Sequence, residues 1–240
     1  MMNEITPRTM ARLTGIFYLI TIVGGLFAQG FVADSLINFA DAGKTASNIL
    51  ANETLYRAGF TVYLIEMTAQ IVTMVLFYYL LKPVSRSGAL VATVIGLSAS
   101  VIKTFARALF LTPLWVLHHG NSLAGYTPDQ INSLALVLLR INDEGAAIAV
   151  ALFGPSTLLH GWLIMKSGFL PKWMGLLSVA GGIMWTSFYW PSLGRSLFMV
   201  SAVIALVGVL ATIGWLIFKG VDEQRWRERE AAARASSIWR

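Results

Sequence analysis

The stretch GALVATVIGLSASVIKTFARALFLTPLWVL, residues 88–117, decides the fold class of this protein. It is apolar from end to end except for Lys103, Arg107 and a few small hydroxyl side chains. A helix of about 20 apolar residues crosses a hydrocarbon core of about 30 Å, and this stretch is longer than that. Its apolar residues are continuous rather than alternating, which favours a membrane helix over a barrel strand. The sequence therefore predicts a transmembrane helix that contains two positive charges.

The composition of the whole chain agrees with that prediction. The 240 residues are 56% hydrophobic and only 12% charged, and the mean hydropathy is +0.68. A soluble domain carries about 25% charged residues, so this share is low. The chain has no cysteine, which excludes disulfides, thiolate metal sites and thiol nucleophiles. The composition thus indicates a polytopic membrane protein.

Six apolar runs have the length of a membrane-spanning helix. They cover residues 12–32, 58–81, 88–117, 145–165, 170–190 and 197–218. The first run has the basic flank of a signal peptide, but its apolar core is too long, so we expect it to remain as an anchor. We predict an all-α polytopic bundle of six transmembrane helices over residues 1–220, followed by a charged cytoplasmic tail helix over residues 221–240.

Lysine and arginine residues gather on one side of this predicted bundle, and such residues mark the cytoplasmic side. With both termini cytoplasmic, that side holds Arg8, Arg12, Lys82, Arg86, Lys166, Lys172, Lys219 and the five arginines of the tail. The opposite side holds only Lys44, Arg57 and Arg195. Membrane insertion therefore explains the net charge of +6, and we predict no nucleic-acid partner. The tail is either a solvated helical end or a contact with the lipid bilayer through its arginines, Trp226 and Trp239.

Ionisable residues converge in the outer third of the predicted bundle. Helical rise places Lys103 about 8 Å below the outer face, and Arg107 lies one turn higher on the same side of the helix. Glu66, on the antiparallel second helix, lies about 12 Å from the same face. The candidate ligand-binding residues are Glu66, Lys103, Arg107, Arg140, Asp143 and Glu144. We expect an anionic group to dock between Lys103 and Arg107, and we predict no cofactor.

Two structural explanations of these charges stand beside the functional one. Lys103 and Arg107 have long side chains that can reach the outer headgroups from within the bilayer. Alternatively, the charges form a structural network that holds three helices together, because buried ion pairs do not by themselves indicate function. Glu66 is the hardest residue to explain without a partner, since its side chain is short and a charge at mid-bilayer costs about 3 kcal/mol.

The histidines suggest a weaker alternative. His118 and His119, with Asp143, offer ligands that suit zinc, although adjacent residues on a helix point in different directions. His160 lies 16 residues from Glu144 along the predicted fourth helix, about 24 Å away. We therefore expect His160 to hydrogen-bond a neighbouring helix rather than to join the outer cluster.

Several blocks of the sequence resemble one bacterial family. The block GWLIMKSGFLPKWMG (161–175), together with ARLTGIFYLI, DAGKTASNILANETLYRAGF and YYLLKPVSR, is similar to the family known as domain of unknown function 4386. The resemblance covers residues 9 to about 218 and implies a multi-pass protein of a bacterial cytoplasmic (inner) membrane. It implies no reaction.

Three functions remain open from the sequence. The first is a transporter or a binding protein for a small anionic or amphipathic ligand, with its polar site in the outer half of the bilayer. The second is a membrane-embedded metal-dependent hydrolase that uses His118, His119 and Asp143. The third is a scaffold or accessory subunit that acts through helix packing. We favour the first, a role that is not enzymatic, because Glu66 and Lys103 are costly to bury.

Overall fold

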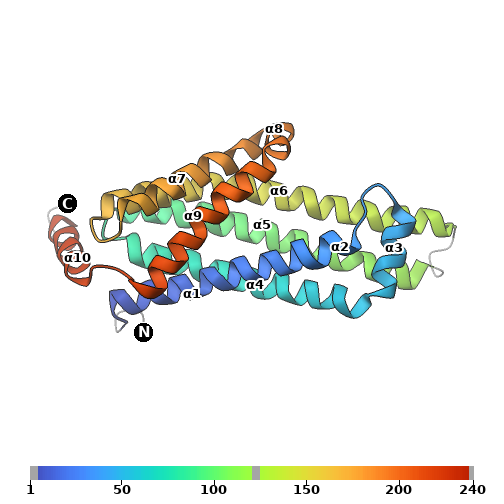
Figure 1. Cartoon of the computed structure of the whole chain (residues 1–240), viewed down its shortest axis with the longest axis horizontal. Helices are drawn as coiled ribbons and strands as arrows, with labels where there is room; N and C mark the ends of the chain where they lie inside the picture. Colours follow the sequence, from blue (N-terminus) through green and yellow to red (C-terminus); the bar gives the residue numbers. More distant parts are fainter. Residues whose placement is uncertain (1–4, 121–124, 238–240) are drawn as a thin grey trace. The chain divides into compact units, whose positions relative to one another are not determined.

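The computed structural model describes residues 5–120 and 125–237, and within these ranges the chain is helical and has no strand (Figure 1). The elements are α1 (Pro7–Gly25), the π-helix η2 (Leu26–Ala33), α2 (Asp34–Leu36), α3 (Ala42–Ala51), α4 (Glu53–Leu81), α5 (Arg86–His119), α6 (Pro128–Ser167), α7 (Lys172–Thr186), the 3-10 turn η4 (Ser187–Tyr189), α8 (Pro191–Ser196), α9 (Phe198–Phe218) and α10 (Glu223–Ser237). The prediction of an all-α bundle is confirmed.

Five of the six predicted spans are helices long and apolar enough to cross a membrane. They are Pro7–Leu36, Glu53–Leu81, Arg86–His119, Pro128–Ser167 and Phe198–Phe218. The predicted span over residues 170–190 gives the shorter helix α7, of 15 residues. The 3-10 turn η4 continues α7 to Tyr189 and ends there because Pro191 disfavours a helical conformation at the residue before it; Trp190 is extended, with φ −114° and ψ 95°.

The helix that starts at Pro128 runs straight into the fourth predicted span. α6 is a single helix of 40 residues, and a helix of that length measures about 60 Å, twice the thickness of a hydrocarbon core.

Between α1 and α4 the polar connection contains α2 and α3. Asp41 caps α3 by accepting a hydrogen bond of 2.9 Å from the Lys44 backbone N–H.

The described residues form two compact units. The first unit contains the chain up to Leu19, Ala69–Ser100 and the chain from Ile148 onward. Its core includes Phe77, Leu80, Leu163, Leu216 and Trp226.

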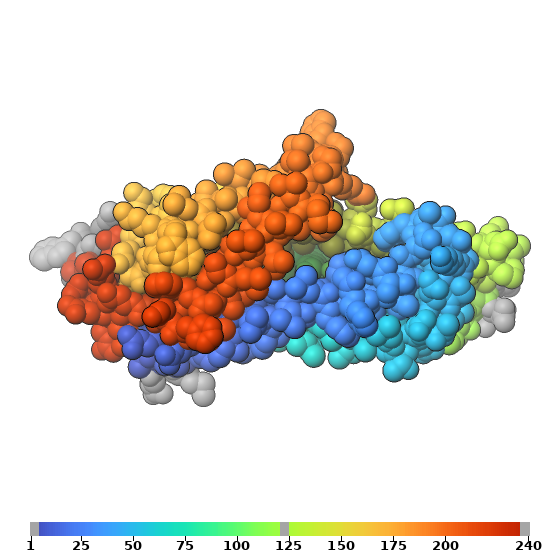
Figure 2. All heavy atoms as spheres, in the orientation of Figure 1, coloured from blue at the N-terminus to red at the C-terminus, as the bar shows by residue number. Residues whose placement is uncertain are grey.

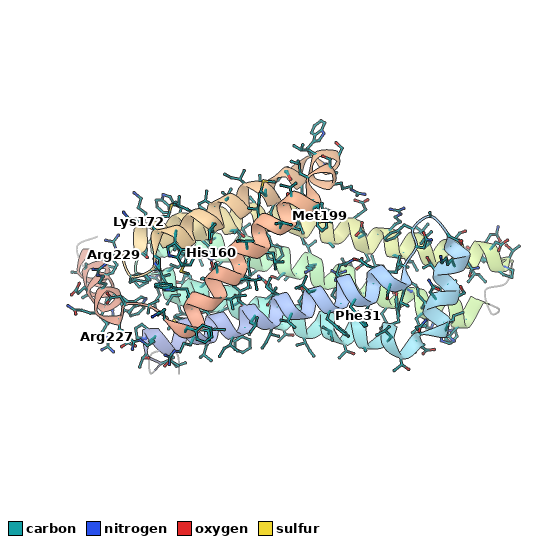
Figure 3. The ribbon with its side chains drawn as sticks, in the orientation of Figure 1. Phe31, His160, Lys172, Met199, Arg227 and Arg229 are labelled. Atoms are coloured by element: carbon teal, nitrogen blue, oxygen red, sulfur yellow. The ribbon has the colours of Figure 1, made fainter. Side chains whose placement is uncertain are left out.

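Helix α10 packs into this first unit through Trp226. The indole ring is buried and its Nε1–H donates a hydrogen bond of 2.9 Å to the Leu80 carbonyl at the end of α4. Trp226 is therefore not available for a lipid contact, which was one of the two interpretations of the tail, and Trp239 lies outside the described residues. Arg227 and Arg229, labelled in Figure 3, are exposed on the same helix.

In the same unit, glycines allow helices to pack backbone against backbone. A Cβ atom at Gly161 of α6 would lie 2.7 Å from the Gly175 carbonyl oxygen of α7, and one at Gly182 would lie 2.7 Å from the Leu158 nitrogen. Such distances are accessible only to glycine, so α6 and α7 approach each other as small-residue membrane helices do. α7 also packs against α9, and in Figure 2 the two helices lie side by side, α7 in amber and α9 in orange-red.

The second unit contains Ile20–Thr68 and Val101–Ala147. Its core includes Val32, Ile49, Tyr56, Tyr63 and Phe110. The Tyr56 ring stacks on Phe110, with centroids 4.5 Å apart, and its hydroxyl donates a hydrogen bond to the Phe110 carbonyl.

The surfaces of both units are strongly apolar. Phe31 is 60% exposed and Met199 is 72% exposed; both are labelled in Figure 3. Glu66 and Arg107, in contrast, are buried. Apolar side chains outside and charged side chains inside are typical of a protein whose solvent is lipid. With five helices of spanning length, the chain is a membrane protein.

Candidate functional site

The second unit holds a buried charge network. We use this name for Tyr63 and Glu66 of α4, Lys103 and Arg107 of α5, and Asn142 of α6. The residues come together because Tyr63 and Glu66 are three positions apart on one helix, while Lys103 and Arg107 are four apart on another, so each pair shares a helix face.

Glu66 and Lys103 form the ion pair that the sequence predicts. The Lys103 Nζ donates to Glu66 Oε1 over 2.6 Å, and the exposed fractions of the two side chains are 19% and 3%. The second carboxylate oxygen of Glu66, Oε2, is buried with no hydrogen-bond partner among the described residues. The acid of α4 and the base of α5 thus face each other inside the unit rather than turning towards lipid.

Two glycines at the end of α1 lie against Glu66. A Cβ atom at Gly24 would lie 3.3 Å from the Glu66 Cβ, and one at Gly25 would lie 3.4 Å from Glu66 Oε1. Immediately after Gly25 the chain changes from α- to π-helical over Leu26–Ala33. π-Helical turns are rare in proteins, and those that do occur are frequently found at functional sites.

Arg107 is buried among neutral groups. Its guanidinium carbon lies 3.7 Å from the centre of the Tyr63 ring, and its Nη1 donates a hydrogen bond of 3.0 Å to the Asn142 side-chain oxygen. The Nε atom is buried and has no hydrogen-bond partner in the described part of the chain. Because Arg107 is only 3% exposed, the explanation that it reaches the headgroups is wrong.

Tyr63 and Asn142 were not among the residues predicted from the sequence. Tyr63 also donates a hydrogen bond of 2.7 Å to Gln29 of η2, and Gln29 donates one of 3.0 Å to Asp34. The signal for Tyr63 was its position one turn before Glu66, which places it on the same face of α4. Asn142 had no signal beyond being an amide next to two acidic residues.

The remaining predicted ligand-binding residues lie on α6 and differ in their surroundings. Arg140 is exposed, with its guanidinium 4.2 Å from the centre of the Phe39 ring and its Nη2 donating to the Phe39 carbonyl over 3.3 Å. Asp143 is half-buried and Glu144 is exposed, and both make interactions of their own. The convergence that we predicted is therefore seen for Glu66, Lys103 and Arg107, while Arg140 contacts Phe39 instead.

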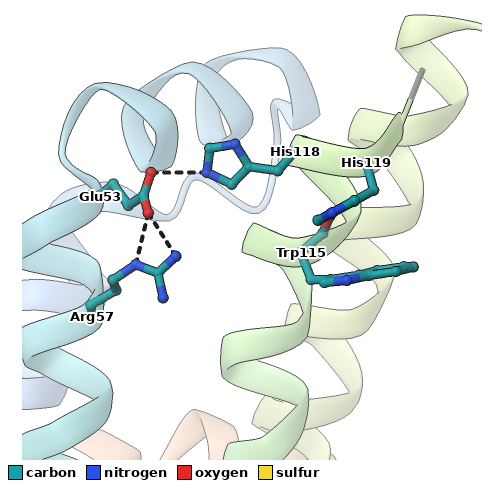
Figure 4. Close-up of polar contacts among 5 residues, drawn as sticks. All are labelled: Glu53, Arg57, Trp115, His118 and His119. Carbon is teal, nitrogen blue, oxygen red and sulfur yellow. Dashed lines mark hydrogen bonds and ion pairs between the residues drawn. The ribbon is translucent and has the colours of Figure 1, made fainter. Parts of the chain in front are cut away.

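The histidine pair does not assemble the metal site that we considered (Figure 4). His118 Nε2 lies 2.9 Å from Glu53 Oε2, and Glu53 also pairs with Arg57 over 2.7 Å. His119 stacks on Trp115, with centroids 4.8 Å apart. Among the described residues no three histidine or acidic side chains gather as metal ligands. The cause is the helix itself, which turns adjacent side chains in different directions.

His160 lies in the first unit and bonds within its own helix, contrary to our expectation. Its Nδ1 is 3.5 Å from the Ser156 hydroxyl of α6. Ser156 makes the link to the neighbouring helix, because its hydroxyl donates a hydrogen bond of 2.8 Å to the Ala92 carbonyl of α5.

The comparisons with known proteins give one result. The family model described as "Domain of unknown function (DUF4386)" matches residues 13–220, which is most of the chain and includes the whole charge network. No curated protein and no solved structure matches the chain.

Proposed function

The chain belongs to the DUF4386 family, and from the geometry of its buried charges we propose that it binds the anionic group of a small or amphipathic ligand. In this proposal the protein is a multi-pass protein of the bacterial cytoplasmic membrane, with both termini in the cytoplasm. The charge network is the binding site, and it serves either binding or transport of the ligand.

The observation that carries the proposal is the environment of Arg107. Glu66 forms an ion pair with Lys103, whereas the partners described in direct contact with Arg107 are an amide and an aromatic ring, both neutral. The carboxylates of Asp34 and Asp143 act electrostatically on Tyr63, but neither is described in an ion pair with Arg107. A guanidinium that is 3% exposed is costly to bury unless its charge is balanced. A carboxylate, sulfonate or phosphate group would supply that balance.

The free edge of the guanidinium also fits an anion. Asn142 occupies Nη1, and the opposite edge carries the Nε atom that has no partner. Two parallel N–H groups on one edge of an arginine match the two oxygens of an anionic group. Lys103, one turn away on α5, adds a second positive charge on the same helix face.

The positions of the termini support six crossings. The Arg8 backbone N–H donates a hydrogen bond of 3.2 Å to the Glu223 carboxylate, so the start of α1 and the start of α10 lie together. A chain whose ends lie on one side crosses a membrane an even number of times, so in this proposal α7 crosses as well as the five longer helices. The 15 residues of α7 with the 3-10 turn after them measure about 28 Å, close to the hydrocarbon thickness.

The experiment measures the binding of decanesulfonate, an amphipathic probe that is permanently anionic. The full chain in nanodiscs of neutral phosphatidylcholine is titrated with radiolabelled probe, and empty nanodiscs give the background. We expect saturable binding that Arg107→Gln weakens about tenfold, as the loss of one charge-assisted hydrogen bond does. Arg57→Gln is the matched control, because Arg57 is an exposed arginine whose loss leaves the network intact.

Two results decide the proposal. Equal binding by the wild type and a folded Arg107→Gln variant would overturn it and leave the network a purely structural feature. If binding depends on Arg107, uptake of the same probe into proteoliposomes then separates transport from binding alone.

A further inference from the structure

A second candidate site lies in the first unit, away from the charge network. A cavity of about 70 Å³ is lined by side chains of α1, α4, α6, α7 and α9, and with the open space in front of it the hollow measures about 570 Å³. Aromatic rings of Tyr18, Phe77 and Trp185 form part of the wall. No Asp, Glu, Lys or Arg is among the described residues that line it.

Two polar atoms in this wall have no partner. His160 Nε2 and Thr212 Oγ1 are buried without a hydrogen bond to any described residue, and both side chains line the cavity. His160 is 6% exposed and Thr212 is 3% exposed. Buried polar atoms are satisfied in the great majority of cases, so two open ones in one apolar wall indicate an occupant that bonds to them.

The hydrogen bonds around His160 show which partner its free atom needs. The Ser156 hydroxyl gives its proton to the Ala92 carbonyl, so its oxygen can only accept from His160 Nδ1. In a neutral imidazole Nε2 is then a bare acceptor. Thr212 carries a hydroxyl that can donate as well as accept. The cavity therefore offers an acceptor and a donor in the same apolar space.

We infer that this cavity binds the hydroxyl end of a neutral lipophilic alcohol that enters from the bilayer. The ligand hydroxyl donates to His160 Nε2 and accepts from Thr212 Oγ1. A carbonyl or an ether cannot donate to Nε2, and an ion would lack a counter-charge in this wall. The aromatic and aliphatic wall covers the first part of the alkyl chain, and the rest extends through the open side of the hollow. This site is independent of the proposed function.

The experiment uses a photoreactive decanol that carries a diazirine in its chain, with the full protein in phosphatidylcholine nanodiscs. Cross-linked peptides are identified by mass spectrometry. We expect labelling of peptides that line the cavity, such as those with Met74 and Ser178. Excess decanol should protect these peptides, whereas decane, which has no hydroxyl, and decanesulfonate, which is charged, should not.

Two variants remove the polar atoms with little change of shape. Thr212→Val and His160→Phe should each reduce the protected labelling about tenfold, the loss typical of a buried hydrogen bond. Thr93→Val and Ser201→Ala are the matched controls, because their hydroxyls are also buried without a partner but do not line the cavity. Thr212→Val should fold as well as the wild type, since valine has the same shape and no polar atom to satisfy, so it decides the test if His160→Phe does not fold.

The outcomes separate this inference from the proposed function. Labelling that Thr212→Val leaves unchanged, or that decanol does not compete, would overturn the inference and leave water as the occupant. Arg107→Gln should not alter decanol labelling, because Arg107 is not among the residues lining the cavity. Failure of decanesulfonate binding therefore says nothing against the alcohol site, and the reverse also holds.

Discussion

At the scale of single residues, Glu66 and Lys103 make each other's burial possible. A buried ion pair contributes little compared with a well-packed apolar pair, but removing one partner leaves an uncompensated charge. Glu66 is the more dependent of the two, because its side chain is 3% exposed whereas that of Lys103 is 19% exposed. Gly24 packs against the Glu66 side chain, where an added Cβ would lie 3.3 Å from the Glu66 Cβ.

Glu66→Gln should therefore lower the free energy of unfolding by about 3 kcal/mol, because it leaves Lys103 without its counter-ion. The double variant Glu66→Gln with Lys103→Met should recover most of that loss. Denaturant unfolding of the purified protein in mixed micelles, followed by tryptophan fluorescence, measures both. Arg57→Gln, which breaks the exposed pair with Glu53, should change little. If the double variant has the same free energy of unfolding as Glu66→Gln alone, Glu66 and Lys103 do not stabilise each other.

At the scale of elements, the glycines of α6 and α7 set how closely these helices approach. Gly161→Ala would place its Cβ 2.7 Å from a backbone oxygen of α7, which cannot move without separating the helices. We expect a loss of about 2 kcal/mol in the free energy of unfolding, the usual cost of overpacking. The control is Gly214→Ala on α9, where nothing lies within 4 Å and alanine favours the helix. Equal effects of the two substitutions would show that the close approach is not required.

The elements were largely predictable from the sequence because the apolar runs are long and lipid permits only satisfied backbones. The end of α7 was harder to predict, since Trp190 and Pro191 interrupt an apolar run without making it polar.

The ion pair between Glu66 and Lys103 was predictable because a carboxylate in a membrane helix needs a partner and helical rise sets its depth. The position of Arg140 outside the charge network was not predicted. Arg140 lies about 200° around α6 from Asn142, which faces Arg107. Neutral partners such as Tyr63 could not be predicted in this way, because an uncharged side chain in a membrane helix does not require a partner of opposite charge.

At the scale of the whole molecule, the number of crossings decides the topology. If only the five helices of spanning length crossed the membrane, α1 and α10 would begin on opposite sides. The hydrogen bond between Arg8 and Glu223 favours the proposed six crossings, which bring the starts of α1 and α10 to the same side. The docking of Trp226 on the end of α4 places α10 on the side where α4 ends, which is also where the basic residues Lys82 and Arg86 lie.

Cysteine labelling tests this topology directly, because the chain has no cysteine of its own. Ser47→Cys in α3 and Ala232→Cys in α10 are exposed positions on opposite sides of the proposed bundle. A membrane-impermeant maleimide added to spheroplasts, which lack the outer membrane, should label the first variant fully and the second only after lysis. The reverse labelling pattern would show that the bundle has the opposite orientation in the membrane, with both termini outside. Labelling of both variants from outside would mean that α7 does not cross, so that the chain spans the membrane five times and the contact between Arg8 and Glu223 does not form.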